Sequence, residues 1–285
     1  MRRTASLVVI SAATGAACLV ATACSSGAAP SGGGAGGSSS FTVTSSMPAS
    51  SGASVSYALS VSFTTAGPAC ASTTVGPCTV NPCYSASSSG DGEVVLPNAG
   101  LVTLLSGNAS LGLEPQSDGT YASESVVGVV PWETAGDIVA FEWAHFPGDT
   151  GEPGDAVTLP APPYVTLAEG SAFAALAGSV ARDTDLTVAW TSTSPAAPTD
   201  DVVVDFVSGG TQVYCTFNAG AGSGVVPADA LEQLEQGVGR YSITSKTHAS
   251  ESIAQRGEAP WTLSFNVQAV ARTSYGLAQG PLTLE

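Results

Sequence analysis

The chain has very few positive charges. Its 285 residues include 7 lysines and arginines against 23 aspartates and glutamates, which gives a formal net charge of −16 at pH 7. Nucleic-acid binding needs clustered Lys and Arg, and the sequence has no such cluster. Lys246 is the single lysine, and no glycine-rich run precedes it, so the phosphate loop of nucleotide-binding proteins is missing as well. The sequence therefore predicts neither a nucleic-acid nor a nucleotide partner.

Motifs for catalysis and for metal binding are also scarce. The chain has two histidines, His145 and His248, and no G-x-S-x-G nucleophile elbow. No two cysteines have the C-x₂-C spacing of a zinc site. These absences favour a protein that is not an enzyme and holds no cofactor. The alternative interpretation is a hydrolase acting on envelope or environmental polymer, with Glu142, His145 or an acidic loop contributing.

That acidic loop runs over residues 147–155 and carries three carboxylates, Asp149, Glu152 and Asp155. Oxygen ligands on a flexible loop suit Ca²⁺, although the spacing differs from the EF-hand pattern. A solvated acidic turn is the simpler interpretation, so the three residues are weak calcium candidates.

The N-terminus has the pattern of an export signal. Arg2 and Arg3 precede an uncharged apolar stretch over residues 7–23, the length of a signal-peptide core. The stretch ends in Val-Ala-Thr-Ala before Cys24, which resembles a bacterial lipobox. We therefore predict a signal peptide over 1–23 and acylation of Cys24, with two or three acyl chains anchoring the protein to a membrane. Ordinary secretion after an A-x-A cleavage site is the alternative.

Residues 25–40 are almost entirely Gly, Ser and Ala, a composition that predicts a flexible tether after the lipidated cysteine. The rest of the chain alternates apolar and polar residues with period two. The longest runs are Val55 to Phe63 and Trp261 to Ala269, and a shorter one joins Val139, Phe141 and Trp143. One buried and one wetted face is typical of antiparallel sheet.

Many short strands separated by Gly, Pro, Asn and Asp turns predict an all-β protein of tandem antiparallel, Ig-like β-sandwiches. The Pro-rich segment 160–163 is the expected boundary, with one sandwich over 41–160 and a second over 161–285. The run 202–207 is apolar on nearly both faces and predicts a central strand. At most two short helices are expected, over 227–236 and more weakly over 171–180.

Four segments of the second half carry a resemblance to known sequences: DLTVAW at 185–190, YCTF at 214–217, GSGVVPADAL at 222–231 and APWTL at 259–263. They resemble predicted lipoproteins of myxobacterial type, and the similarity extends over most of residues 55–270. The resemblance implies a β-rich surface lipoprotein with no assigned activity. No catalytic residue is implied by it.

Four cysteines would remain after removal of the signal and acylation of Cys24: Cys70, Cys78, Cys83 and Cys215. An even number in an exported protein predicts disulfides. One local pair is expected among the first three, which would leave the remaining one to bind Cys215. The alternative is that Cys215 is a buried free thiol.

Aromatic residues gather in one segment of the first half. Trp143 shares strand parity with Phe141, which favours the core. Trp132 follows a proline outside any clear strand, and it is the candidate for an exposed ligand-binding surface, for example for a glycan. The predicted function is a lipid-anchored, non-catalytic envelope protein that binds a glycan or an envelope protein, at the outer membrane or cell surface if the bacterium is Gram-negative.

Overall fold

The computed structural model describes residues 37–46, 55–65, 71–82, 84, 100–107, 109–116, 121, 124–143, 155–169, 179–197, 199–253, 261–274 and 276–285. Almost all regular structure in them is β-strand, as the alternation predicted. Three sheets are present, and the largest extends through both halves of the sequence. The all-β, sandwich-like prediction is confirmed.

The largest sheet has 11 strands, nine of which follow in the order β3-β4-β14-β13-β16-β17-β1-β2-β7, while β20 pairs with β16 and β11 with β20. Its strands are β1 (Gly37–Ser46), β2 (Ser56–Thr65), β3 (Thr73–Val75), β4 (Cys78–Asn81), β7 (Glu124–Val127), β11 (Ser179–Val180), β13 (Asp201–Ser208), β14 (Thr211–Asn218), β16 (Gly237–Ile253), β17 (Trp261–Val270) and β20 (Gln279–Leu284).

Two smaller sheets pack against the large one. The four-stranded sheet has the order β6-β5-β8-β9 and the five-stranded sheet the order β15-β12-β10-β18-β19. Their strands are β5 (Val102–Ser106), β6 (Ala109–Leu113), β8 (Ile138–Trp143), β9 (Asp155–Pro160), β10 (Val165–Leu167), β12 (Leu186–Ser192), β15 (Ser223–Val226), β18 (Arg272–Thr273) and β19 (Gly276–Leu277).

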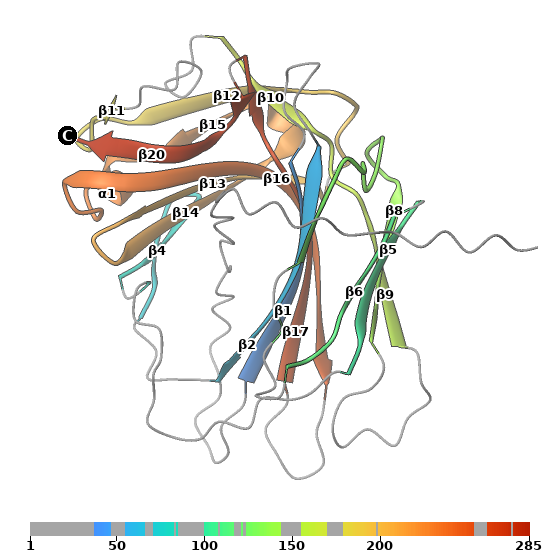
Figure 1. The fold of residues 1–285 in the computed structure, drawn as a ribbon. Coiled ribbons are helices and arrows are strands. Elements are labelled where there is room, and N and C mark those ends of the chain that lie inside the picture. The colour runs from blue at the N-terminus through green and yellow to red at the C-terminus, as the bar shows by residue number, and fades with distance from the viewer. Residues whose placement is uncertain are drawn as a thin grey trace, which may run out of the picture.

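The large sheet bends where the 17-residue strand β16 passes from one set of neighbours to another (Figure 1). Residues 240–246 of β16 pair with β13, and residues 244–253 pair with β17. The four-stranded sheet lies beside β1, β2 and β17, and the five-stranded sheet lies beside β13 and β16 (Figure 1). One strand therefore belongs to two sandwich-like layers.

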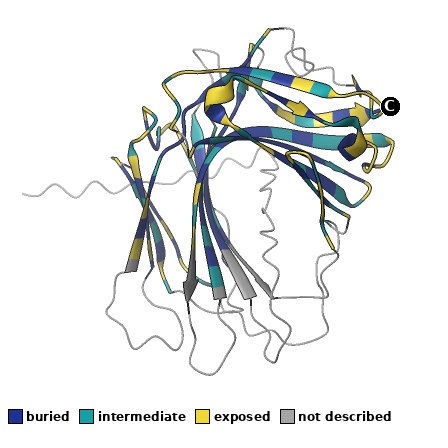
Figure 2. Cartoon of the chain, turned by 180° about the vertical axis from the view of Figure 1, so that it is seen from behind, coloured by how far each residue is buried: buried dark blue, intermediate teal, exposed yellow. Residues whose placement is uncertain are grey.

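Two hydrophobic cores result, one on each arm of the bent sheet and both on the same face of it. The first lies between the four-stranded sheet and β1, β2 and β17, and it includes Phe41, Phe141, Trp143 and Phe265. The second is bounded by β4, β13, β14, β16, β20 and the five-stranded sheet. Figure 2 shows the buried residues following the strands of the large sheet, with exposed residues at the outer turns. Each core draws side chains from both sides of the predicted boundary at 160–163.

Three strand pairings differ from the antiparallel expectation. The longest is β1 with β17, which is parallel from Ser38↔Thr262 to Ser46↔Val270. The pairs β10–β18 and β11–β20 are also parallel. Parallel neighbours need a long connection, and between β1 and β17 that connection is most of the chain. The alternation predicted which side of each strand is buried and carried no information on this pairing.

Helix is confined to short pieces in the described residues. The predicted helix over 227–236 is shorter in the structure: α1 spans Ala228–Leu231, with Pro227 as its N-cap residue. Leu231 and Leu234 are both buried, as their shared face predicted. A 3₁₀ turn, η1, covers Ala219–Ala221. Of the weaker helix at 171–180, residues 179–180 form β11 and the rest lie outside the described part.

Candidate functional site

One face of the large sheet packs on the cores and the other is polar. The strand registers place the polar side chains of six neighbouring strands on the same face, opposite to the face that packs on the cores. The two smaller sheets lie on the outer side of the bend in Figure 1, so the polar side is the inner one. We call this surface the polar face. It consists of Thr79, Asn81, Gln212, Tyr214, Asp201, Asp205, Arg240, Lys246, His248, Asn266, Gln268, Thr42 and Thr44, with Val203, Val207 and Val270 as apolar members. Thr42, Asp205, Gln212 and Asn266 are buried, as are Val203 and Val270.

The central strand β13 shows how the sequence makes this division. Val202, Val204 and Phe206 point into the second core and are fully buried. Their neighbours Asp201 and Asp205 occupy alternate positions and point to the polar face. The predicted central strand is confirmed. The same two-residue alternation that buries its apolar side chains places both of its carboxylates on the polar face.

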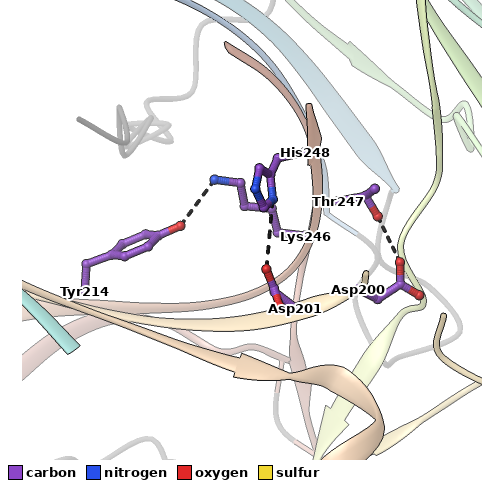
Figure 3. A network of polar contacts seen from close by, with 6 residues as sticks. All are labelled: Asp200, Asp201, Tyr214, Lys246, Thr247 and His248. Carbon is purple, nitrogen blue, oxygen red and sulfur yellow. Dashed lines mark hydrogen bonds and ion pairs between the residues drawn. The ribbon is translucent and has the colours of Figure 1, made fainter. Parts of the chain in front are cut away.

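Lys246 lies in the middle of this surface, partly buried on β16 (Figure 3). Its Nζ donates a hydrogen bond to Tyr214 Oη at 3.3 Å and lies 5.8 Å from the centroid of that ring. Burial lowers the pKa of Lys246 to about 8, and the Asp201 carboxylate opposes part of that change. Burial raises the pKa of the Tyr214 phenol, so this hydroxyl stays protonated.

Asp201 of β13 is paired in register with Lys246 of β16, and it also lies beside His248, which follows Lys246 on β16. Its Oδ2 lies 3.9 Å from His248 Nδ1, and the imidazole is more exposed than the carboxylate. Burial raises the pKa of the Asp201 carboxyl, while His248 and Lys246 act in the opposite direction. An acid, an amine and an imidazole therefore meet within two adjacent strands.

Thr247 of β16 points to the opposite face from Lys246, where it meets Asp200, the residue directly before β13 (Figure 3). The Thr247 hydroxyl donates to Asp200 Oδ1 at 3.0 Å, and the Ala197 amide donates to Oδ2 at 2.6 Å. Both side chains are almost fully buried. These bonds hold the turn that leads into β13, and they fix the position of Asp201 beside it.

A second chain of polar contacts lies along β4, β14 and β13. Asn81 Nδ2 donates to Gln212 Oε1 at 3.0 Å, and Gln212 Nε2 donates to Asp205 Oδ1 at 2.9 Å. Burial raises the pKa of the Asp205 carboxyl to about 6, against the opposing effects of the Gln212 hydrogen bond and of Arg240. The order of donors and acceptors is thus fixed across three strands.

The polar face continues onto β17 and β1 with neutral side chains. Gln268 Nε2 donates to Thr44 Oγ1 at 2.7 Å, and Asn266 Nδ2 donates to Ser40 Oγ at 3.1 Å. These bonds join strands that are more than 200 residues apart in the sequence. Hydrogen-bonding groups of the polar face are therefore found on both arms of the bent sheet.

The described carboxylates of this surface do not form a close pair. Asp201 and Asp205 are four residues apart on one strand, which separates their Cα atoms by about 13 Å. Glycoside hydrolysis uses two carboxyl groups about 5–9.5 Å apart. Glu142, named in the hydrolase alternative, is exposed on the outer face of β8 and points away from Phe141 and Trp143, as its strand parity predicted.

Trp132 corrects one prediction. It was expected to offer an exposed aromatic face, but its side chain is only 2% exposed and belongs to the first core. Its ring stacks on Tyr164 at 5.8 Å between centroids. Trp132 lies in an irregular segment without periodicity, so the sequence did not indicate that the Tyr164 ring would cover it.

The cysteine prediction is settled for one pair. Cys78 and Cys215 form a disulfide between paired positions of β4 and β14, so the alternative of a free buried thiol at Cys215 is wrong. Cys24, Cys70 and Cys83 lie outside the described residues, as do His145, Asp149 and Glu152. Asp155 begins β9, and nothing is described of its side chain.

The described residues contain neither a metal-binding cluster nor a membrane-spanning helix. In that part of the chain no group of three or more His, Cys, Asp or Glu side chains is placed to hold a metal ion. No helix within the described ranges has the length and apolar character needed to cross a membrane.

Sequence reasoning did not select the residues around Lys246 as a site. Lys246 was notable only as the single lysine, and Tyr214 and Asp201 were each one polar residue among many on wetted strand faces. Their proximity depends on the registers of β13 with β14 and with β16, which no local pattern specifies.

No protein-family model and no curated protein matches this chain. A similar solved structure is described as a Ca²⁺-stabilised adhesin that helps an Antarctic bacterium reach out and bind ice. The match covers 81% of this chain and 49% of that chain, at 13% sequence identity and a TM-score of 0.16. This chain thus spans about half the length of that one, and a TM-score of this size carries no argument about fold or function.

Proposed function

We propose that the chain is a lipid-anchored, non-catalytic binding protein of the bacterial cell envelope, and that its polar face binds a glycan. The observation that carries the proposal is the set of hydrogen-bonding side chains that six neighbouring strands place on the side of the large sheet that faces neither core. On a sheet face that only contacts water, polar side chains need no fixed partners. Here the side chains are also fixed by bonds to one another across strands.

The composition of the polar face suits a ligand rich in hydroxyl groups. Each hydroxyl both donates and accepts hydrogen bonds, so a glycan needs both kinds of partner at close spacing. Asp201 offers acceptors, Lys246 and Arg240 offer donors, and the amides of Gln268 and Asn81 offer both. Because Lys246, Gln268 and Asn81 are held by hydrogen bonds before binding, little of their side-chain entropy is lost when a ligand meets them.

Anchoring by acyl chains is supported by the sequence pattern before Cys24. Replacement of Cys24 by Ala removes the thiol that takes the lipid, so the protein should move from the membrane fraction to the soluble fraction of the cells that make it. Retention of the Cys24→Ala variant in membranes, with unchanged mobility, would overturn the anchoring part of the proposal.

Glycan binding is tested by thermal melts of the full chain with soluble cello-oligosaccharides, chito-oligosaccharides, peptidoglycan fragments and lipopolysaccharide core oligosaccharide. A ligand that binds only the folded state stabilises it by about 2.7 kcal/mol at a hundredfold excess over Kd. We expect a saturable rise of the midpoint with one glycan class, reduced in Asp201→Ala and in Gln268→Ala.

The matched control is Thr187→Ala, a change at an exposed position of β12 on a different sheet. It should keep the full shift. A flat response to the whole panel would contradict glycan binding and would favour an envelope-protein partner. A shift that survives both polar-face substitutions would place the ligand elsewhere.

A further inference from the structure

Lys246 combines three properties that are rare together in one side chain. It is the only primary amine that a side chain of this protein provides. It is partly buried, yet it lies on a face that no core covers. Its Nζ touches a phenolic hydroxyl, that of Tyr214, at 3.3 Å. An amine beside a protonated hydroxyl is an arrangement that can form a covalent bond to a carbonyl carbon.

The groups that share the polar face with this amine come from β13, β14, β16 and β17 and have mixed charge. Asp201 of β13 and Gln268 of β17 are its register partners on either side. Arg240 and His248 lie on the same face of β16, and Asp205 lies next to Tyr214 in register. Burial outweighs the opposing effect of the Asp201 carboxylate, which is why the pKa of Lys246 is lowered to about 8.

We propose that Lys246 is a covalent capture site for aldehydes and for the open-chain carbonyl of reducing sugars, with Tyr214 as the proton relay. The neutral Nζ attacks the carbonyl carbon, and the carbonyl oxygen takes a proton to give a carbinolamine. That oxygen then leaves as water with a second proton, and the nitrogen lone pair forms the C=N bond. Carbonyl and amine give imine and water, so no oxidant or reductant is needed.

The role of Tyr214 follows from its position and its protonation state. Burial keeps the phenol protonated, so it can give its proton to the departing oxygen and recover one from the amine. The sequence has no second lysine, so an adduct on a side-chain amine has one possible residue. The inference does not rest on glycan binding, because a free aldehyde can react at Lys246 without any glycan site on the polar face.

The test uses the full chain, glyceraldehyde as the probe, and a borohydride quench that fixes the imine as a secondary amine. Trypsin cleaves native sequence after Lys246 and Arg256, and a modified Lys246 blocks the first cut. The reacted protein should therefore yield a fragment over 241–256 in place of 241–246 and 247–256. Peptide mapping separates this adduct from reaction at the chain's N-terminal amine.

The expected result is an adduct at Lys246 whose yield rises with pH around a midpoint near 8. At pH 7 the neutral fraction of an amine with that pKa is about 300-fold larger than that of an ordinary lysine at 10.5. The same chain unfolded in urea is the reference, and its midpoint should lie above 10. A native midpoint at or above 10, or an adduct found only in the unfolded chain, would overturn the inference.

Variants separate a reactive site from a merely exposed lysine. Tyr214→Phe keeps the ring and removes the hydroxyl, so adduct formation at pH 8 should slow at least several-fold. Thr216→Val, at an exposed position two residues along the same face of β14, should leave the rate unchanged. If Tyr214→Phe does not fold, Asp201→Asn serves instead, and loss of its carboxylate should move the midpoint to lower pH. An unchanged rate in Tyr214→Phe, or an unchanged midpoint in Asp201→Asn, would refute the assigned roles.

Discussion

The disulfide between Cys78 and Cys215 should be a major contributor to the stability of the second core. It joins β4, from the first half of the sequence, to β14, from the second, and its cysteines are 137 residues apart. Both side chains are fully buried against Val80 and Val213. The perturbation is the double substitution Cys78→Ala with Cys215→Ala, which opens the loop and adds no new polar group to the core.

The magnitude follows from the length of the loop. Closing a loop of this size lowers the entropy of the unfolded chain by an amount worth about 5 kcal/mol at 25 °C in the chain-entropy account. A typical domain has a total free energy of unfolding of only about 5–15 kcal/mol. Loss of the bond should therefore remove a large share of the stability, because the unfolded chain gains freedom while β4 keeps only its strand pairing.

The assay is hydrogen exchange followed by mass spectrometry, with urea unfolding of the same samples. Peptides from β4 and β14 should lose protection by about three orders of magnitude or more, which corresponds to several kcal/mol at 1.4 kcal/mol per tenfold. Peptides from β5 and β8, in the first core, are the internal control and should change much less. A double variant within 1 kcal/mol of the parent, or one that loses protection in β5 and β8 first, would refute the reasoning.

A double variant is preferred to a reducing agent because a reductant would also open any second disulfide. With Cys78 and Cys215 joined, four cysteines of the sequence remain: Cys70, Cys83, and Cys18 and Cys24 of the N-terminal segment that is predicted to carry the signal and the lipid. Non-reducing peptide mapping should therefore find the local pair Cys70–Cys83. Free thiols at both positions would contradict the prediction that the exported protein is fully oxidised.

Two further predictions concern buried polar atoms. Burial raises the pKa of the Asp205 carboxyl from 3.8 to about 6 in the folded chain, so ionisation of this group costs stability. The cost is absent below about pH 4, grows as the pH rises to about 6, and stays constant above that. Asp205→Asn should therefore stabilise the protein more at pH 8 than at pH 4 in urea titrations, and an equal effect at both pH values would contradict this. Trp190 donates its Nε1–H to Ala219 O at 2.9 Å, whereas Trp132 Nε1 has no partner in the described residues. In chemical unfolding, Trp190→Phe should therefore lower the free energy of unfolding by about 1–3 kcal/mol more than Trp132→Phe does. Equal losses in the two variants would contradict a stabilising role of the Trp190 hydrogen bond.

Period-two patterns predicted the buried faces with success. Val139, Phe141 and Trp143 are all in the first core, and Val202 to Phe206 form the central strand of the second. These predictions succeed because the alternation of a strand fixes which side chains share a face. The same patterns contain nothing about which strand is the neighbour, so the parallel pairing of β1 with β17 could not be predicted.

The candidate site was less accessible to prediction for the same reason. Tyr214 and Lys246 are 32 residues apart and meet only because β13 lies between their strands in a particular register. The prediction that Trp132 is exposed was wrong because its ring packs on Tyr164, and neither residue lies in a periodic segment that would have indicated this contact. Composition and alternation predict the wetted face of a sheet, and tertiary pairing decides which of its residues act together.

The most direct test of the account is a hydrogen-exchange footprint of the full chain with the same soluble glycan panel. Binding at the polar face predicts added protection in peptides of β13, β14 and β16, together with unchanged exchange in β5, β6 and β8. Asp201→Ala should abolish that protection, and Thr187→Ala should retain it. Protection confined to the four-stranded sheet, or no protection with any glycan, would contradict the central claim that this face is the binding surface.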